Sequence, residues 1–240
     1  MNTVRTVSDT KRAFYNLHTR PVNSIYRRVV EELMVEMHLL AVNVDFRYNP
    51  IYALGVVTSF DRFMQGYRPE QDKESIFNAL CRSTEDDPDR YRQDAQHLLS
   101  LASRFSWDTV LMPEKSEGIS DLASLRESLQ SIAGDAKFKY SRLFAIGLFT
   151  LLETADADLV KDEVQRTQAL NQISQALNLP EDKIQKDLDL YRSNLEKMVQ
   201  VQAMMADVLI VDRKKREERA QAKADAANSE APKDEAASGS

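Results

Sequence analysis

Two stretches of this chain, 92 residues apart, repeat one another and constrain the fold more than any other feature. They lie within Asn49–Tyr67 and Ser141–Glu153, where the run YALGVVT is matched by FAIGLFT. Each is apolar almost all round, which is typical of a helix buried on every side. Each also holds a glycine, although glycine inside a helix costs about 1 kcal/mol relative to alanine. We interpret them as two core helices, either similar by chance or derived from one duplicated helical unit.

Further echoes follow each stretch in the same order and favour the duplication. An I-x-x-A-L segment occurs at Ile76–Leu80 and again at Ile173–Leu177. Each is followed by a short acidic signal for a helix start, and then by an amphipathic helix that contains Asp94 in the first case and Asp187 in the second. We therefore predict a degenerate internal duplication of about 55 residues.

The composition favours helices and a reducing compartment. Only six of the 240 residues are glycine and seven are proline, while 42% are hydrophobic, as expected of a globular helical protein. The single cysteine, Cys81, excludes an internal disulfide. The longest apolar run, Leu143–Leu152, is shorter than the ~20 residues that span a bilayer. The first residues lack the apolar region of a signal peptide.

Charge is unevenly distributed along the chain. The net charge of −6 argues against a general nucleic-acid binder. Residues 1–30 nevertheless contain six basic residues and one acidic residue. This N-terminal basic face, which includes Arg20, Arg27 and Arg28, suits an acidic partner or an anionic membrane surface. A merely solvated basic face is the alternative interpretation.

The last predicted helix differs from its counterpart in the first half by its length. From Glu181 no helix breaker occurs until past Ala220, which predicts a helix of about 60 Å. Apolar residues along it alternate in steps of four and three, the pattern of a coiled-coil seam. Its segment Met198–Val211 is apolar on several faces and is followed by the charged run DRKKREER.

These patterns predict an all-α protein with about eight helices. Residues 1–178 form a compact helical domain, and residues 179–222 form a long coiled-coil-like helix packed partly on that domain. Residues 223–240 are rich in Ala, Lys, Asp, Glu and Ser, and we predict that they form a disordered tail. The heptads are compatible with packing within the chain or between chains, so the oligomeric state stays open.

No arrangement of residues in the sequence is typical of a catalytic, cofactor or metal site. Neither the P-loop nor the dinucleotide-binding glycine pattern occurs. The histidines, His18, His38 and His97, are isolated, whereas a helical di-iron site needs two E-x-x-H pairs. Cys81 lies on an apolar stripe and is better explained as a small buried hydrophobe. We therefore expect a protein that is not an enzyme and that has no cofactor and no small-molecule substrate.

Three blocks of the sequence resemble one known family. They are Thr6–Asn43, Asn49–Cys81 and Lys139–Glu153, the last with the run KYSRLFAIGLFTLLE. Together these blocks are similar to the thylakoid-formation proteins, also described as photosystem II biogenesis factors of cyanobacteria and plastids. The resemblance covers about residues 4–215. Because the signature begins at Thr6, with no transit peptide before it, the chain resembles the cyanobacterial form.

The resemblance implies a non-enzymatic, all-helical auxiliary factor in thylakoid biogenesis and photosystem II repair. Members of the family are thought to bind and stabilise the FtsH protease complexes that remove damaged photosystem II subunits. The expected partners are thylakoid FtsH complexes and photosystem II subunits, without nucleic acid. The expected location is the cytoplasmic face of the thylakoid membrane, as a peripheral protein. The alternative is a membrane-surface structural protein that organises thylakoid membranes or vesicles directly.

No family motif marks the partner interface, so the candidate residues come from this sequence alone. Met-rich apolar surfaces suit adaptable protein binding, although the same segment would also suit packing on the protein's own core. The candidates are Arg20, Arg27 and Arg28 of the N-terminal basic face and Met198, Met204, Met205, Val208, Arg213, Lys214 and Lys215 of the last helix.

Overall fold

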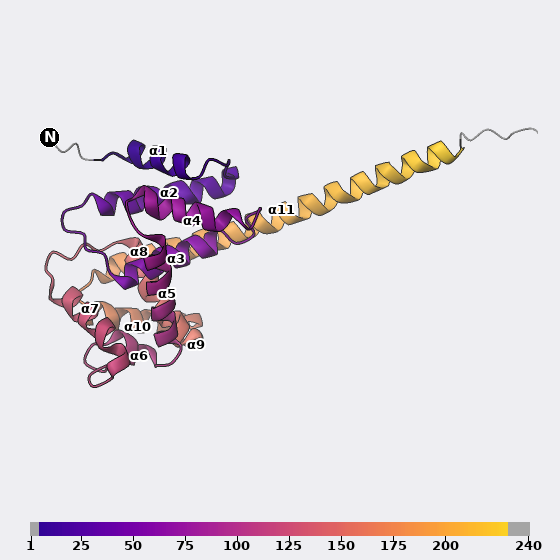
Figure 1. The fold of residues 1–240 in the computed structure, drawn as a ribbon. Coiled ribbons are helices and arrows are strands. Elements are labelled where there is room, and N and C mark those ends of the chain that lie inside the picture. The colour runs from indigo at the N-terminus through magenta and orange to yellow at the C-terminus, as the bar shows by residue number, and fades with distance from the viewer. Residues whose placement is uncertain (1–4, 230–240) are drawn as a thin grey trace, which may run out of the picture. The chain divides into compact units, whose positions relative to one another are not determined.

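Helices are the only regular secondary structure in residues 5–229, the part of the chain that this computed structural model describes (Figure 1). The chain divides into two compact units, the first ending at Leu195 and the second beginning at Glu196. In chain order the helices are α1 (Val7–Leu17), α2 (Ser24–Ala41), α3 (Pro50–Phe63), α4 (Asp72–Ser83), α5 (Pro88–Ala102), α6 (Trp107–Leu111), the 3₁₀-helix η1 (Ser120–Leu122), α7 (Ala123–Gly134), α8 (Arg142–Ala155), α9 (Ala157–Lys161), α10 (Glu163–Ala176) and α11 (Glu181–Ser229).

The all-α prediction is confirmed, but the predicted number of about eight helices is too low. Eleven α-helices and one 3₁₀-helix lie within the described residues. The elements that the prediction missed are α6 and α9, and each is five residues long. A single helical turn is too short to show apolar periodicity in the sequence.

Helix α11 also extends further than predicted. It continues to Ser229, so residues 223–229, which we predicted to be disordered, are helical. This stretch contains alanine, lysine and other residues compatible with a helix, and no glycine or proline. Residues 230–240 of the predicted tail lie outside the described residues.

The core of the first unit is the crossing of α3 and α8, the two helices that echo one another in sequence (Figure 1). Ten consecutive residues of each helix are buried. At the crossing, a Cβ atom on Gly55 would lie 1.7 Å from the carbonyl oxygen of Leu143, and one on Gly147 would lie 1.9 Å from that of Ile51. Only glycine permits such an approach of two backbones. Packing therefore explains the helical glycine in each echo.

The surroundings of the crossing also occur twice. Asn49 caps α3 by accepting a hydrogen bond from the Tyr52 amide at 2.9 Å, and Ser141 caps α8 by accepting one from the Phe144 amide at 3.1 Å. Both residue types are favoured N-caps. Tyr52 and Phe144 each contact a phenylalanine of the preceding segment, with ring centroids 5.0 Å apart in both cases. The matching residues are 92 positions apart.

A tyrosine before each core helix binds the amphipathic helix of its own half. The Tyr48 hydroxyl donates a hydrogen bond to Asp94 of α5 at 2.6 Å, and the Tyr140 hydroxyl donates one to Asp187 of α11 at 2.8 Å. A basic side chain one turn earlier on each helix lies over the tyrosine ring. Burial, and secondly the neighbouring carboxylate, raises the pKa of both hydroxyls. Both therefore remain hydrogen-bond donors at neutral pH.

The ends of α4 and α10 establish the register between the halves. Each helix ends in a Schellman motif with a residue of positive φ, Glu85 at 67° and Asn178 at 52°. These two residues are 93 positions apart, and buried positions of the two helices match at the same offset. The I-x-x-A-L segments are therefore one turn out of register, because Ile173 is equivalent to Leu80 and not to Ile76. The many matched contacts favour duplication over chance similarity.

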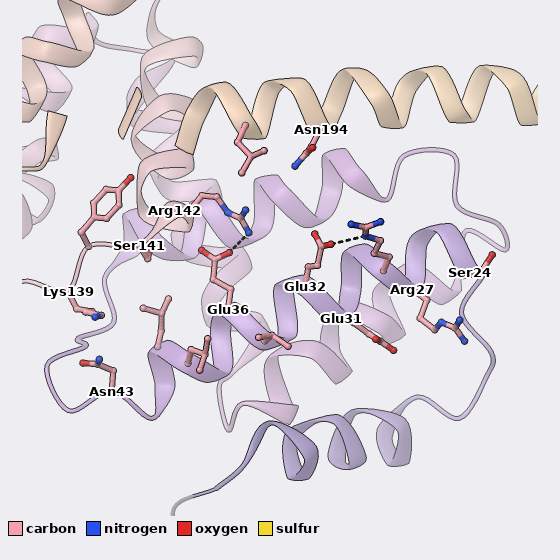
Figure 2. Close-up of a pocket in the computed structure, with 16 residues that line it drawn as sticks. Ser24, Arg27, Glu31, Glu32, Glu36, Asn43, Lys139, Ser141, Arg142 and Asn194 are labelled. Carbon is pink, nitrogen blue, oxygen red and sulfur yellow. Dashed lines mark hydrogen bonds and ion pairs between the residues drawn. The ribbon is translucent and has the colours of Figure 1, made fainter. Parts of the chain in front are cut away.

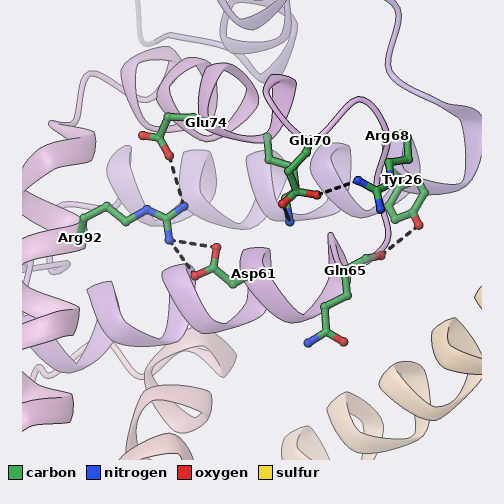
Figure 3. Close-up of polar contacts among 8 residues, drawn as sticks. Tyr26, Asp61, Gln65, Arg68, Glu70, Glu74 and Arg92 are labelled. Carbon is green, nitrogen blue, oxygen red and sulfur yellow. Dashed lines mark hydrogen bonds and ion pairs between the residues drawn. The ribbon is translucent and has the colours of Figure 1, made fainter.

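The halves diverge at the surface and in the length of their last helix. Arg92 of α5 binds both carboxylate oxygens of Asp61 at 2.9 and 2.7 Å and lies 3.8 Å from Glu74, whereas its counterpart in α11 is Gln185 (Figure 3). Helix α5 ends at Ala102, and α11 continues past the equivalent residue, which is the last residue of the first compact unit. The first turns of α11 bury the predicted seam within the chain, at Ile184, Leu188 and Tyr191.

Candidate interaction surface

Two of the three histidines and the single cysteine are buried in the fold. No group of three His, Cys, Asp or Glu residues in this part of the chain is placed to hold a metal ion. Cys81 is buried, and burial raises the pKa of its thiol, which disfavours the reactive thiolate. His18 and His38 are buried and lie 2.9 Å from the hydroxyls of Ser75 and Thr10. No helix among residues 5–229 combines the length and apolarity needed to cross a bilayer.

The N-terminal basic face is largely paired with carboxylates of the same chain. The pairs are Arg5–Glu85 at 2.8 Å, Lys11–Glu31 at 2.9 Å, Arg12–Asp9 at 3.4 Å, Arg28–Glu32 at 2.9 Å and Arg20–Asp72. Hydrogen bonding to the Lys11 ammonium holds the pKa of Glu31 below its usual value. Among the described residues, Arg27 is the one member of the face without such a partner. The free positive charge of this face is therefore smaller than the sequence indicates.

The remaining candidates lie on α11, in the second compact unit. Met204 is 68% exposed, and Val199 and Val211 are exposed on either side of it. Met198 continues the seam and keeps only 7% of its surface exposed, so it offers little to a partner. The side chains of two further candidates lie outside the described residues, namely Met205 and Val208. Among the side chains that the structure describes, the exposed large apolar residues of the predicted patch are Val199, Met204 and Val211.

The basic candidates of α11 are exposed. Arg213 pairs with Glu217 one turn later at 3.3 Å, a contact that is worth little at the surface. Lys214 and Lys215 are exposed to solvent. The three residues remain available to an acidic partner.

A groove along the outer face of α2 was missed by sequence reasoning. This α2 groove has a volume of about 1130 Å³ and lies between α2, the start of α8 and the first turns of α11 (Figure 2). Three large apolar side chains line it while remaining exposed: Leu39 is 56% exposed, Leu190 is 48% exposed, and Val35 is partly exposed. Val35 and Leu39 lie one turn apart and off the buried stripe of α2. That second apolar line was the available signal.

The carboxylates of the α2 groove are already bound by basic groups. Glu36 pairs with Arg142 of α8 at 2.6 Å, and Glu32 pairs with Arg28 at 2.9 Å (Figure 2). Glu31 is bound by Lys11, as described above. Acidic groups of the groove are therefore poorly placed to attract a cationic ligand.

Two basic side chains of the α2 groove form no ion pair at contact distance, although the charge of Arg27 helps to lower the pKa of Glu31 one turn away. Arg27 lies near the start of α2, and Lys139 lies beside Asn43 at the opposite end (Figure 2). Within residues 5–229, neither has a carboxylate at ion-pair distance. The groove thus presents an apolar middle and a free positive charge towards each end.

Comparison with known proteins gives a consistent set of similarities. A sequence model of a family described as thylakoid formation protein matches residues 6–220. A protein named Thf1 from Trichormus variabilis is 64% identical over 222 residues, which cover 92% of this chain and 95% of that protein. Thf1 of Gloeothece citriformis is 56% identical over 220 residues, or 91% of this chain and 97% of that protein. A solved structure of Psb29 has a TM-score of 0.74 at 44% identity and covers 88% of this chain and 98% of that chain.

Proposed function

Since this chain belongs to the thylakoid formation protein family, the family of Thf1 and Psb29, we propose that it is a non-enzymatic auxiliary factor in photosystem II repair. In this role it binds and stabilises FtsH protease complexes at the cytoplasmic face of the thylakoid membrane. Family membership confirms the resemblance seen in the sequence. The FtsH partner is the one that the family resemblance implies, and the site of contact is proposed from the structure of this chain.

The proposal is carried by the part of α11 that has no counterpart in the other half. Elements that the repeated core requires are present twice, but α11 continues beyond the point that corresponds to the end of α5. This extension exposes Val199, Met204 and Val211. Several exposed apolar residues along one helix are typical of a surface that docks on another protein. Flexible methionine also adapts well to a partner's shape.

Affinity capture from thylakoids tests the proposal. The tagged full-length chain is mixed with a mild-detergent extract of cyanobacterial thylakoids, and the retained FtsH subunits are quantified by mass spectrometry. We expect retention by the unaltered chain and a loss of about tenfold in the double variant Met204→Glu, Val211→Glu, because each charge would be buried in an apolar contact. The matched control is Val164→Glu, which charges an exposed valine on α10 of the first unit and should retain FtsH fully.

The outcomes separate the function from the surface. If the unaltered chain retains no FtsH, the proposed function is wrong. If the double variant keeps its helical circular dichroism and retains FtsH like the control, the contact does not use the α11 extension.

Direct organisation of membranes draws less support. Five of the six basic side chains of the N-terminal basic face are paired within the chain, which reduces the free charge that this face offers to anionic lipids. We expect the chain not to float with liposomes of anionic lipid at physiological salt. Flotation under those conditions would favour the structural role over the FtsH role.

A further inference from the structure

The α2 groove has a counterpart in the other half of the molecule. A groove of about 380 Å³, the α7 groove, is lined by α7 and by Arg47–Pro50, which leads into α3. The α2 groove is lined by α2 and by Lys139–Arg142, which leads into α8. These lining elements correspond at an offset of 92 residues. The buried positions beneath them agree as well, since Leu33 of α2 matches Leu125 of α7.

The two grooves differ in chemistry at their exposed positions. The apolar side chains of the α2 groove are Val35, Leu39 and Leu190, and the residues equivalent to them are Glu127, Ser131 and His97. All three equivalents are polar and exposed. Because the second half folds with polar residues at all three positions, the fold does not require apolar ones in the first. Leaving apolar surface in water forgoes about 25 cal/mol per Å² that burial would recover. A ligand that covers this surface would recover it.

The length and the charges of the α2 groove define what could cover it. The groove follows α2 from Ser24 to Asn43, about 28 Å at 1.5 Å per residue. This length suits a docked helix of about five turns, or about 18 residues. Arg27 and Lys139 supply positive charges without an ion-pair partner at contact distance towards the two ends, while the acidic groups between them are paired (Figure 2). An occupant with acidic ends and an apolar face would be complementary to all three regions.

We propose that the α2 groove binds an amphipathic helix of a partner protein, with apolar residues on one face and acidic residues at both ends. The apolar face covers Val35, Leu39 and Leu190, and the terminal carboxylates pair with Arg27 and Lys139. This is recognition of a helix in a groove, in which apolar anchors one turn apart supply the affinity. The inference concerns a surface of the first unit and holds whether or not the α11 extension binds FtsH.

Selection from a displayed peptide library tests the inference. The peptides are helices of about 18 residues with apolar residues on one face, and their terminal residues are randomised among Asp, Glu, Lys, Arg and Ser. They are selected on the immobilised full-length chain and on the double variant Val35→Glu, Leu39→Ser. This variant copies the residues of the α7 groove, so it should fold normally. We expect enrichment of acidic residues at both ends on the unaltered chain, and recovery about tenfold lower on the variant.

A mirror variant provides the control. Glu127→Val with Ser131→Leu adds the same apolar residues to the α7 groove, and it should leave the binding of the enriched peptides at the α2 groove unchanged. Equal recovery on the Val35→Glu, Leu39→Ser variant, or enrichment of basic ends, overturns the proposal.

Sedimentation gives a further test. If the unaltered chain dimerises and this variant does not, a second copy of the chain occupies the groove and the proposed partner helix does not.

Discussion

The two halves of the first unit share an interior and differ on their surfaces. Helices α3 and α8 cross through paired glycines, and each half repeats the same N-cap, aromatic contact and tyrosine–aspartate bond. Outside this shared interior, the α2 groove is apolar where the α7 groove is polar, and α11 continues where α5 ends. Features that occur twice are explained by folding. Exposed features that occur once are not required by the repeated interior, and they are therefore the best candidates for binding.

We expect the largest effect on stability from substitutions that disrupt the crossing of α3 and α8. Gly55→Ala and Gly147→Ala each place a Cβ within 2 Å of a backbone carbonyl oxygen that belongs to the other helix. Because backbone cannot move aside as a flexible side chain can, we expect each to lower the free energy of unfolding by about 3 kcal/mol or more. Urea denaturation measures both. Gly134→Ala, whose Cβ would meet nothing within 4 Å, is the control and should be neutral or slightly stabilising. A large cost at only one of the two core glycines would contradict the equivalence of the halves.

A smaller effect tests the repeated tyrosine–aspartate bond. Tyr48→Phe and Tyr140→Phe each remove a hydrogen bond to a partly buried carboxylate. We expect each to cost about 1.5 kcal/mol, with the two costs adding in the double variant because the sites are independent. Denaturant titration of the three variants checks this. If one substitution proves neutral, the corresponding hydrogen bond contributes nothing to stability. The two halves would then share the geometry of this bond but not its energetic contribution.

The two Schellman motifs sharpen the comparison because their left-handed residues differ. Glutamate is unfavourable at positive φ, whereas asparagine tolerates it. We expect Glu85→Gly to raise the free energy of unfolding by about 0.5 kcal/mol. This is a net value, because the substitution also removes the exposed ion pair between Glu85 and Arg5. Asn178→Gly should change it less. Thermal unfolding of the two variants compares them, and a larger gain at Asn178 would show that the local backbone conformation does not limit stability at Glu85.

The smallest expected effect is a pH dependence confined to the first half. Asp86 accepts a hydrogen bond from Tyr91 at 2.8 Å, and burial raises the pKa of this carboxyl above its ordinary 3.8. The protonated form is thus favoured in the folded state, so the stability that it contributes is present below pH 3.8 and lost as pH rises through the folded pKa. We expect Asp86→Asn to gain stability relative to the unaltered chain between pH 4 and 7. The equivalent residue, Leu179, cannot titrate, and a constant difference across this range would contradict the assignment.

The shared interior was largely predictable from sequence, because a helix that is apolar on every side has few other places to lie. The echo of Gly55 and Gly147 even indicated the close crossing. The register between the halves was harder to predict. The two I-x-x-A-L segments are identical in sequence pattern, but they occupy positions that differ by one helical turn between the equivalent helices. The one-turn helices α6 and α9 carry no periodicity. Their existence follows from tertiary context.

The candidate binding surfaces were predictable only in part. The extension of α11 was visible as a long segment without breakers, and Met204 proved exposed. The α2 groove was not predicted. Val35 and Leu39 form a second apolar line off the buried stripe of α2, but the sequence does not show that this line stays exposed. Their exposure depends on where α8 and α11 pack, which local patterns do not encode. Likewise, the partners of the N-terminal basic face, such as Glu85 and Asp72, are distant in sequence.

Hydrogen exchange of the full-length chain, with and without purified FtsH complex, tests most directly whether binding uses the features that occur once. We predict slower exchange on binding in peptides from the α11 extension, residues 196–222. Peptides from α7 and α10 on the first unit should exchange at unchanged rates. Slower exchange centred on α7 or α10, with residues 196–222 unaffected, would contradict the claim that the unshared parts of the molecule carry its function.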